Sequence, residues 1–370
     1  MLNTKVKALL GAAIASVMLG LVSAPVLAHH PIQAKFDKAA EMSVTGVVTN
    51  VDWKNPHVHV FLNVKNGTTL TNWAVELESP LLLKGSGWGS QSVKPGDTLT
   101  VKGIRARDGS RQLWSEEVTK GGTALLTLKN LRPAVPAKKE PAPRGADGKV
   151  ILGSATGYWG FPSSYALVED AVKVKMDKYG QLADLSDAAK VAPLQPWALA
   201  LYKNRQQRDL RDDPMFLHCK PPGGPRQYQS DLGIKFVEDK INQRVFILMG
   251  SGNRNYRIVY LDGRDKVGSV TGDADNPLYY GRAIGKWEGD TLLVTTKGFN
   301  EDFWMSNGGL PHTNNMVLTE RFTRPDMNTL QYQVAIDDHG AYTRPWTASW
   351  TMQWVPDQEV PIHFCQDNRP

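Results

Sequence analysis

Apolar and polar residues alternate with a period of two along most of the chain, which is the pattern of β-strands that bury one face. The clearest case is residues 346–354, where every second side chain is apolar and the side chains between them are polar. The apolar face of this strand consists of Trp346, Ala348, Trp350, Met352 and Trp354. The pattern predicts a mainly β protein.

Residues 42–118 contain about five short alternating runs separated by turn sequences such as Asn66-Gly67 and Asp108-Gly109. Gly46, inside the first run, would let that strand bend. Several strands of this length within fewer than ninety residues predict a small OB-like barrel.

The second half alternates strands with tight turns, so each strand lies one hairpin from the next. This arrangement favours an antiparallel up-and-down β-barrel, with a half-barrel or a sandwich as alternatives. One helix is expected from Pro196, because proline suits the first helical turn and Arg205 and Arg208 suit the last. The predicted strands are Gly233–Glu238, Arg244–Met249, Asn255–Leu261, Ala283–Trp287, Thr291–Lys297, Met316–Phe322, Thr329–Ile336 and Trp346–Trp354.

A proline-rich run at 132–143 separates the two halves and cannot form a helix or a central strand. We therefore expect an OB-like domain at 29–128, a linker at 129–155 and a β-barrel-like domain at 156–370.

The first 28 residues have the features of a signal peptide: two early lysines, the apolar run Ala8–Ala15 and small residues around Ala28. Cleavage after Ala28 would place the protein in the periplasm or outside the cell. The apolar run is short for a membrane span, so no span is expected in the mature chain. In an oxidising compartment Cys219 and Cys365, the only two cysteines, are expected to form one disulfide.

The formal net charge of +6 is mild for 370 residues. The densest basic cluster lies in the proline-rich linker and not on a face with interleaved aromatic residues, so no nucleic-acid partner is expected. Sequence motifs of the common hydrolases, of nucleotide-binding loops and of haem attachment are also missing from the sequence.

Two sets of motifs resemble known families. Residues 53–59, with His29-His30, resemble small exported bacterial domains of uncharacterised function. The second half resembles a family often fused to such a domain, through the Gly-x-Trp-Glu-Gly-Asp-Thr-Leu motif at 285–292 and the Tyr-Thr-Arg-Pro-Trp motif at 342–346. These resemblances imply two domains and export, and they imply no particular reaction.

Three histidines are candidate metal ligands. Cleavage after Ala28 would leave His29 at the N-terminus, where its amine and imidazole can chelate one ion, and copper or zinc suits such nitrogen donors. His57 and His59 lie two apart on a predicted strand and so share a face with each other. The alternative is that all three are ordinary solvated histidines.

The candidate catalytic residues are His312, Glu320 and Arg344. His312 follows a glycine-rich loop that a barrel mouth would carry, and Glu320 on the next strand is placed to orient its imidazole. Arg344 would stabilise developing negative charge.

The candidate ligand-binding residues surround Arg344. Tyr342 and Trp346 are expected on the same face as Arg344, giving a cation between two aromatic rings, although a ladder covering the barrel wall is an equal alternative. Residues of other elements that would add to this mouth are Tyr256, Arg257 and Trp304.

Three functions remain open. The first is an exported protein that binds a small apolar or aromatic ligand in the second barrel. The second is a lyase, isomerase or hydratase without a nucleotide cofactor, using His312 as acid or base. The third is copper or zinc binding through His29.

Overall fold

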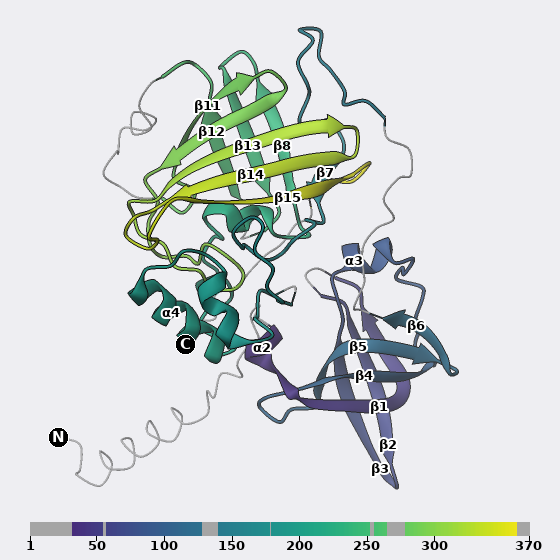
Figure 1. Cartoon of the computed structure of the whole chain (residues 1–370). Coiled ribbons are helices and arrows are strands. Elements are labelled where there is room, and N and C mark those ends of the chain that lie inside the picture. Colours follow the sequence, from purple (N-terminus) through teal and green to yellow (C-terminus); the bar gives the residue numbers. More distant parts are fainter. Residues whose placement is uncertain are drawn as a thin grey trace, which may run out of the picture.

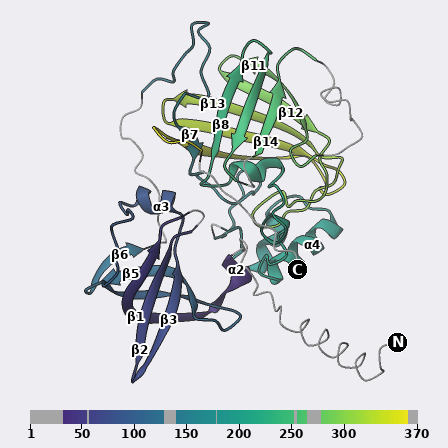
Figure 2. The same ribbon diagram turned by 180° about the vertical axis from the view of Figure 1, so that it is seen from behind.

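The computed structural model of the chain describes residues 32–54, 57–127, 140–177, 179–251, 255–264 and 278–360. Within these ranges the strands form two units, a six-stranded sheet followed by a closed barrel of nine strands. Figures 1 and 2 show the smaller, purple and blue unit beside the larger green and yellow barrel. The expected mainly β fold is confirmed.

The first unit closes on itself. β1 pairs with β2 and β4, and a parallel pairing of β3 with β5 completes the ring β1-β2-β3-β5-β4, with α3 between β3 and β4. This is the five-stranded, Greek-key barrel of an OB-like domain. Its elements are α2 (Ile32–Lys35), β1 (Phe36–Asp52), β2 (His59–Asn66), β3 (Thr69–Glu76), α3 (Pro80–Gly85), β4 (Thr98–Ala106), β5 (Gln112–Lys120) and β6 (Thr123–Thr127).

β1 changes partner along its length, because its first part pairs with β4 and its last part with β2. Gly46 lies where this change occurs, and a Cβ atom there would stand 2.6 Å from the carbonyl oxygen of Asn63. Glycine is thus required by a close approach of two backbones, which agrees with the bend expected at this position.

The second unit follows the predicted strands closely, and β9 and β12 have the predicted bounds. The side chains at alternate positions of β15 are buried, as the pattern at 346–354 predicts. The strands are β7 (Tyr158–Gly160), β8 (Ile234–Asp239), β9 (Arg244–Met249), β10 (Asn255–Tyr260), β11 (Arg282–Glu288), β12 (Thr291–Lys297), β13 (Val317–Asp326), β14 (Thr329–Asp337) and β15 (Trp346–Val355).

The barrel is not antiparallel throughout. β10 and β11 run parallel, with Val259 opposite Ala283. A ring of nine strands joined in sequence order cannot alternate direction all the way round, because nine is odd, so one neighbouring pair must be parallel. The expectation of consecutive hairpins is wrong at this one connection.

Helix α4 (Pro196–Gln207) begins at the expected proline and ends one residue before Arg208. Ala198, Tyr202 and Gln206 form its buried face, at the i, i+4 spacing of one helix side. The Gln206 side chain donates to the carbonyls of Gly180 and Gly308 and accepts from the amide of Leu182. These bonds fix α4 to the loops at one end of the barrel. Three shorter helices are η2 (Leu185–Lys190), α5 (Pro214–Leu217) and η3 (Gly224–Tyr228).

The second domain begins earlier than expected. Val150 and Leu152 are buried in the barrel core, although both were assigned to the linker. Arg144 makes two hydrogen bonds of 2.9 and 2.6 Å to Asp290. Residues 140–155 are therefore part of the barrel domain, and residues 128–139 lie outside the described part of the chain.

Within the described ranges, apolar side chains of the two units pack together at two places. Leu82 of α3 packs with Tyr158 and Val355 of the barrel. On the other side, Tyr179 packs against the cluster of α2, β1, β4 and β5 that contains Trp114. No helix in the described ranges has the length and apolar character needed to cross a membrane.

Candidate functional site

The interior of the large barrel contains a buried group of polar side chains, which we call the polar core: Arg257, Glu320, Thr296, Tyr228 and Tyr332. Arg257 on β10 and Glu320 on β13 form a bidentate ion pair, with Nη1–Oε1 and Nη2–Oε2 distances of 3.0 and 2.5 Å. Both side chains are almost completely buried, at 2% and 0% exposed. Two parallel bonds fix their relative orientation.

Each remaining member of the polar core bonds to this pair. Arg257 donates to the hydroxyls of Tyr228 and Thr296 at 2.6 and 2.5 Å. Glu320 accepts from the hydroxyls of Thr296 and Tyr332 at 3.1 and 3.0 Å. The charge of the carboxylate is thus distributed over four donor contacts, as a buried ion requires.

Strand register explains why these side chains meet. Glu320 faces Val294 of β12 and Val334 of β14, so it projects inward from the middle of the sheet. Tyr228 comes from outside the sheet, at the end of η3, and its ring lies 4.7 Å from that of Tyr332. The short helix η3 therefore fills part of the barrel interior with a tyrosine.

The electrostatics keep Arg257 charged and the two tyrosines of the polar core protonated. Burial by itself lowers the pKa of Arg257, but Glu320 and Tyr228 outweigh it and hold that pKa above its usual value. Burial raises the pKa of Tyr228 and Tyr332 well above the usual value of a tyrosine. The guanidinium is therefore charged and both phenols are protonated at neutral pH.

Several other buried polar atoms lack a hydrogen-bond partner in the described part of the chain. Gln229, the residue after Tyr228, has neither its amide oxygen nor its amide nitrogen satisfied. The same lack of a hydrogen-bond partner in the described part of the chain is found for the indole nitrogens of Trp346 and Trp350 and for the Nε of Arg257. The ring of Trp350 lies 4.6 Å from that of Tyr332, so this unsatisfied group adjoins the polar core. Most buried polar groups of native proteins bond to protein or to water, so these atoms can form hydrogen bonds with water or with a ligand.

His312 lies outside the polar core. Its ring nitrogens are each 3.2 Å from a backbone carbonyl, of Thr313 and of Phe303, and its ring lies 4.1 Å from that of Phe303. Burial lowers its pKa. The expected orientation of His312 by Glu320 is wrong, because Glu320 points into the barrel and is occupied by Arg257.

Arg344 does not share a face with its aromatic neighbours. Its side chain is 57% exposed and bonds to Glu169 at 2.6 and 3.0 Å, while Tyr342 and Trp346 are buried. β15 begins only at Trp346, after Pro345, so the alternation of the strand does not extend back to Arg344. The predicted placement of Arg344 between the rings of Tyr342 and Trp346 is therefore wrong, because β15 starts only after Arg344.

The other predicted ligand-binding residues are scattered. Tyr256 is exposed and points away from Arg257, its neighbour on β10. Trp304 is buried beneath the guanidinium of Arg205, 4.7 Å from its ring centre. Burial lowers the pKa of Arg205 to about 10.

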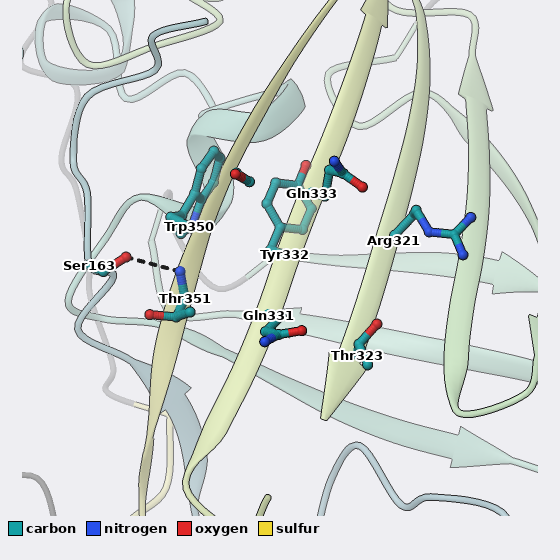
Figure 3. Close-up of a pocket in the computed structure, with 9 residues that line it drawn as sticks. Ser163, Arg321, Thr323, Gln331, Tyr332, Gln333, Trp350 and Thr351 are labelled. Atoms are coloured by element: carbon teal, nitrogen blue, oxygen red, sulfur yellow. Dashed lines mark hydrogen bonds between the residues drawn. The ribbon is translucent and has the colours of Figure 1, made fainter. Parts of the chain in front are cut away.

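A separate hollow of about 400 Å³ lies on the outside of the barrel over β13, β14 and β15. Figure 3 shows polar side chains of these strands around it, with Ser163 joined to Thr351. Its one charged group, Arg321, is 3.2 Å from Glu288. The hollow is open and polar, and its lining includes Tyr332 of the polar core and the adjoining Trp350.

The OB-like domain contains a second polar group. Glu76, at the end of β3, is 5% exposed and receives contacts from Lys35 at 2.8 Å, from His57 Nδ1 at 2.5 Å and from His59 Nε2 at 3.7 Å. Burial raises the pKa of Glu76, but the two histidines and Lys35 outweigh burial and bring it well below its usual value. His57 and His59 thus share one carboxylate.

Glu76 and the tyrosines of the polar core were not identified from the sequence. A turn centred on Asn66-Gly67 would place Ala74 opposite His59, whereas the hairpin turns at Gly67-Thr68 and so places Glu76 there. The predicted turn therefore gave no signal for Glu76. No local signal marks Tyr228, which reaches the core from a short helix. Residues His29 and Cys365 lie outside the described ranges, so the expected disulfide with Cys219 stays a prediction.

The comparisons with known proteins bear on the first domain. Residues 17–114 match a family of unknown function (DUF6152). This range covers most of the OB-like domain and ends within β5. No curated protein is significantly similar to the chain.

Proposed function

We propose that this chain is an exported protein whose large barrel binds a small molecule in its interior, beside the polar core. One observation carries the proposal: Gln229, which follows Tyr228, and Trp350, which packs on Tyr332, present buried atoms that have no hydrogen-bond partner in the described part of the chain, close to the Arg257–Glu320 pair. The signal-peptide features of residues 1–28 support export.

The chemistry of these groups specifies the ligand further. The rings of Trp350 and Tyr332 offer an apolar wall, which suits a flat or aromatic body. The indole N–H groups donate, and the amide of Gln229 both donates and accepts. We therefore infer a ligand with an aromatic or apolar frame that carries at least one oxygen or nitrogen acceptor, such as a carbonyl.

Binding is a better reading of this geometry than catalysis by His312. A proton-transfer site needs its acid or base within hydrogen-bond reach of the substrate. His312 is instead placed between two backbone carbonyls, with no hydrogen bond to the polar core in the described ranges.

Native mass spectrometry of protein purified from its exporting host tests the proposal. We expect a co-purifying small molecule that is released on denaturation. Gln229→Leu should lose this mass, whereas Gln331→Leu on the exposed face of β14 should retain it. Wild-type protein without any bound molecule, and with no ligand recovered from a metabolite extract of the same host, would contradict the proposal.

A further inference from the structure

The hollow on the outside of the large barrel has a floor of two rows of polar side chains that cross β13, β14 and β15. Strand register aligns the rows, because the side chains at matching positions of the three strands lie opposite one another. The first row is Arg321, Gln333 and Ser349, and the second row is Thr323, Gln331 and Thr351. Figure 3 shows the second row running across the three strands. Neighbouring groups of the floor are thus separated by about 5 Å between strands and about 7 Å along a strand.

Ser163 forms a wall of the hollow beyond β15. Its amide donates to the carbonyl of Thr351 at 2.8 Å, and its hydroxyl accepts from the amide of Thr351 at 3.0 Å. Because β7 ends at Gly160, this contact continues the pairing along the edge of β15. The hollow measures about 400 Å³, which lies within the range of small-molecule sites.

The two glutamines of the floor have unused hydrogen-bonding capacity. Gln331 and Gln333 are exposed, and neither side-chain amide has a hydrogen-bond partner in the described ranges. Each amide group both donates and accepts. The centre of the floor therefore offers donors and acceptors side by side, as a ligand with several hydroxyl groups requires.

The first row is polarised from one end to the other. At the β13 end, Arg321 and Lys286 share the carboxylate of Glu288 at 3.2 and 2.9 Å, so positive charge is in excess there. At the β15 end, the Ser349 hydroxyl donates to Asp170 at 2.8 Å, which leaves its oxygen as an acceptor. No Asp or Glu is among the described residues that line the hollow. The row suits a ligand with an anionic group at one end and hydroxyl donors at the other.

We propose that this hollow binds an acidic sugar of the uronate class, with its carboxylate on Arg321 and its hydroxyls on the two glutamines. A guanidinium holds a carboxylate through two parallel N–H donors. Exposed ion pairs are weak, so the exchange of Glu288 for the carboxylate of the ligand costs little. The hydroxyls of a sugar ring donate and accept, which matches the amide groups below them.

This site goes beyond the ligand proposed for the barrel interior and is tested separately from it. Neighbouring residues of a strand project to opposite faces, so Gln331 and Gln333 point outward while Tyr332 between them is buried. Gln229→Leu, which tests the interior site, should therefore leave binding in the hollow unchanged.

The test titrates the full-length chain with galacturonate, followed by the nuclear magnetic resonance signals of the sugar. Galactose lacks the carboxylate and sulfate lacks the hydroxyls, so we expect each of them to bind at least about tenfold more weakly. Arg321→Gln should weaken galacturonate binding about tenfold and remove the preference over galactose. A galacturonate trimer in the same series distinguishes a free sugar from a polysaccharide, and tight binding of either one supports the site.

Glu288→Gln provides a readout that loss of stability would not mimic. This change frees Arg321 from a competing carboxylate and should strengthen galacturonate binding by up to about fivefold. The matched control is Arg208→Gln, which removes an exposed arginine paired with Asp212 at the end of α4 and should leave the affinity unchanged.

Circular dichroism verifies that each variant is folded, and Glu288→Gln alone decides should Arg321→Gln fail to fold. A wild-type chain that binds neither uronate, or that binds galactose or sulfate as tightly as galacturonate, would overturn the proposal. Unchanged binding by a folded Arg321→Gln variant, or weaker binding by Glu288→Gln, would overturn it as well.

Discussion

Arg257 and Glu320 lie 63 residues apart in the sequence and are joined inside the large barrel by two hydrogen bonds of 3.0 and 2.5 Å. They are held by strands that do not neighbour each other, β10 and β13. A buried ion pair gives little net stability compared with apolar packing, so its presence needs another reason. We attribute it to a fixed polar surface for a ligand in the barrel.

Breaking the ion pair should be costly. Glu320→Gln leaves the buried guanidinium of Arg257 without a countercharge, and we expect a loss of about 3–5 kcal/mol in the free energy of unfolding. The double variant Arg257→Met, Glu320→Leu should recover much of this loss. Urea denaturation followed by tryptophan fluorescence measures both.

The matched control for this experiment is Arg344→Met, which breaks the exposed pair with Glu169. Exposed ion pairs contribute about 0–1 kcal/mol, so little change is expected. If Glu320→Gln proved as harmless as Arg344→Met, the buried pair would not be formed in solution.

His312 predicts a pH dependence of stability. Burial holds its folded-state pKa below the ordinary value of 6.5. As the pH falls through 6.5, the unfolded state takes up a proton that the folded state does not bind, so stability decreases until the folded pKa is reached. His312→Gln should flatten the decrease in unfolding free energy below pH 6.5. An identical pH profile for wild type and His312→Gln would show that this imidazole is not desolvated.

Gly103 should tolerate no side chain. A Cβ atom there would lie 1.9 Å from the carbonyl oxygen of Trp114, which is backbone and cannot move away easily. Gly103→Ala should therefore destabilise the OB-like domain by at least about 2 kcal/mol. Gly89→Ala, which meets nothing within 4 Å, is the control for thermal unfolding. Equal melting temperatures for the two variants would refute the close pairing of β4 and β5 at this point.

The disulfide expected between Cys219 and Cys365 can be checked directly. Thiol labelling of exported, denatured and unreduced protein should find no free thiol, because a disulfide between the two cysteines of the chain would occupy both sulfur atoms. After reduction two labels per chain should appear. Two labels before reduction would exclude the disulfide.

The sequence predicted local structure well because alternation records which face of each strand is buried. β9 and β12 have the expected bounds, and the buried face of β15 is the expected one. Turn residues predicted the hairpins, but the parallel pairing of β10 with β11 depends on the total number of strands and has no local signal.

The candidate site was predicted less well because it depends on long-range contacts. Arg257 and Glu320 were both identified, but their pairing requires the closed barrel. Arg344 was placed on the wrong face because Pro345 delays the start of β15. Leu152 was assigned to a linker because prolines precede it, whereas its burial depends on the barrel surface that it meets.

The most direct test of the central claim is an experimental electron-density map of the barrel interior, from protein purified out of its exporting host without refolding. Our account predicts density for a small organic molecule within about 3.5 Å of the Gln229 amide and the Trp350 indole nitrogen. Density for ordered water alone at these atoms, or side chains that satisfy one another directly, would contradict it.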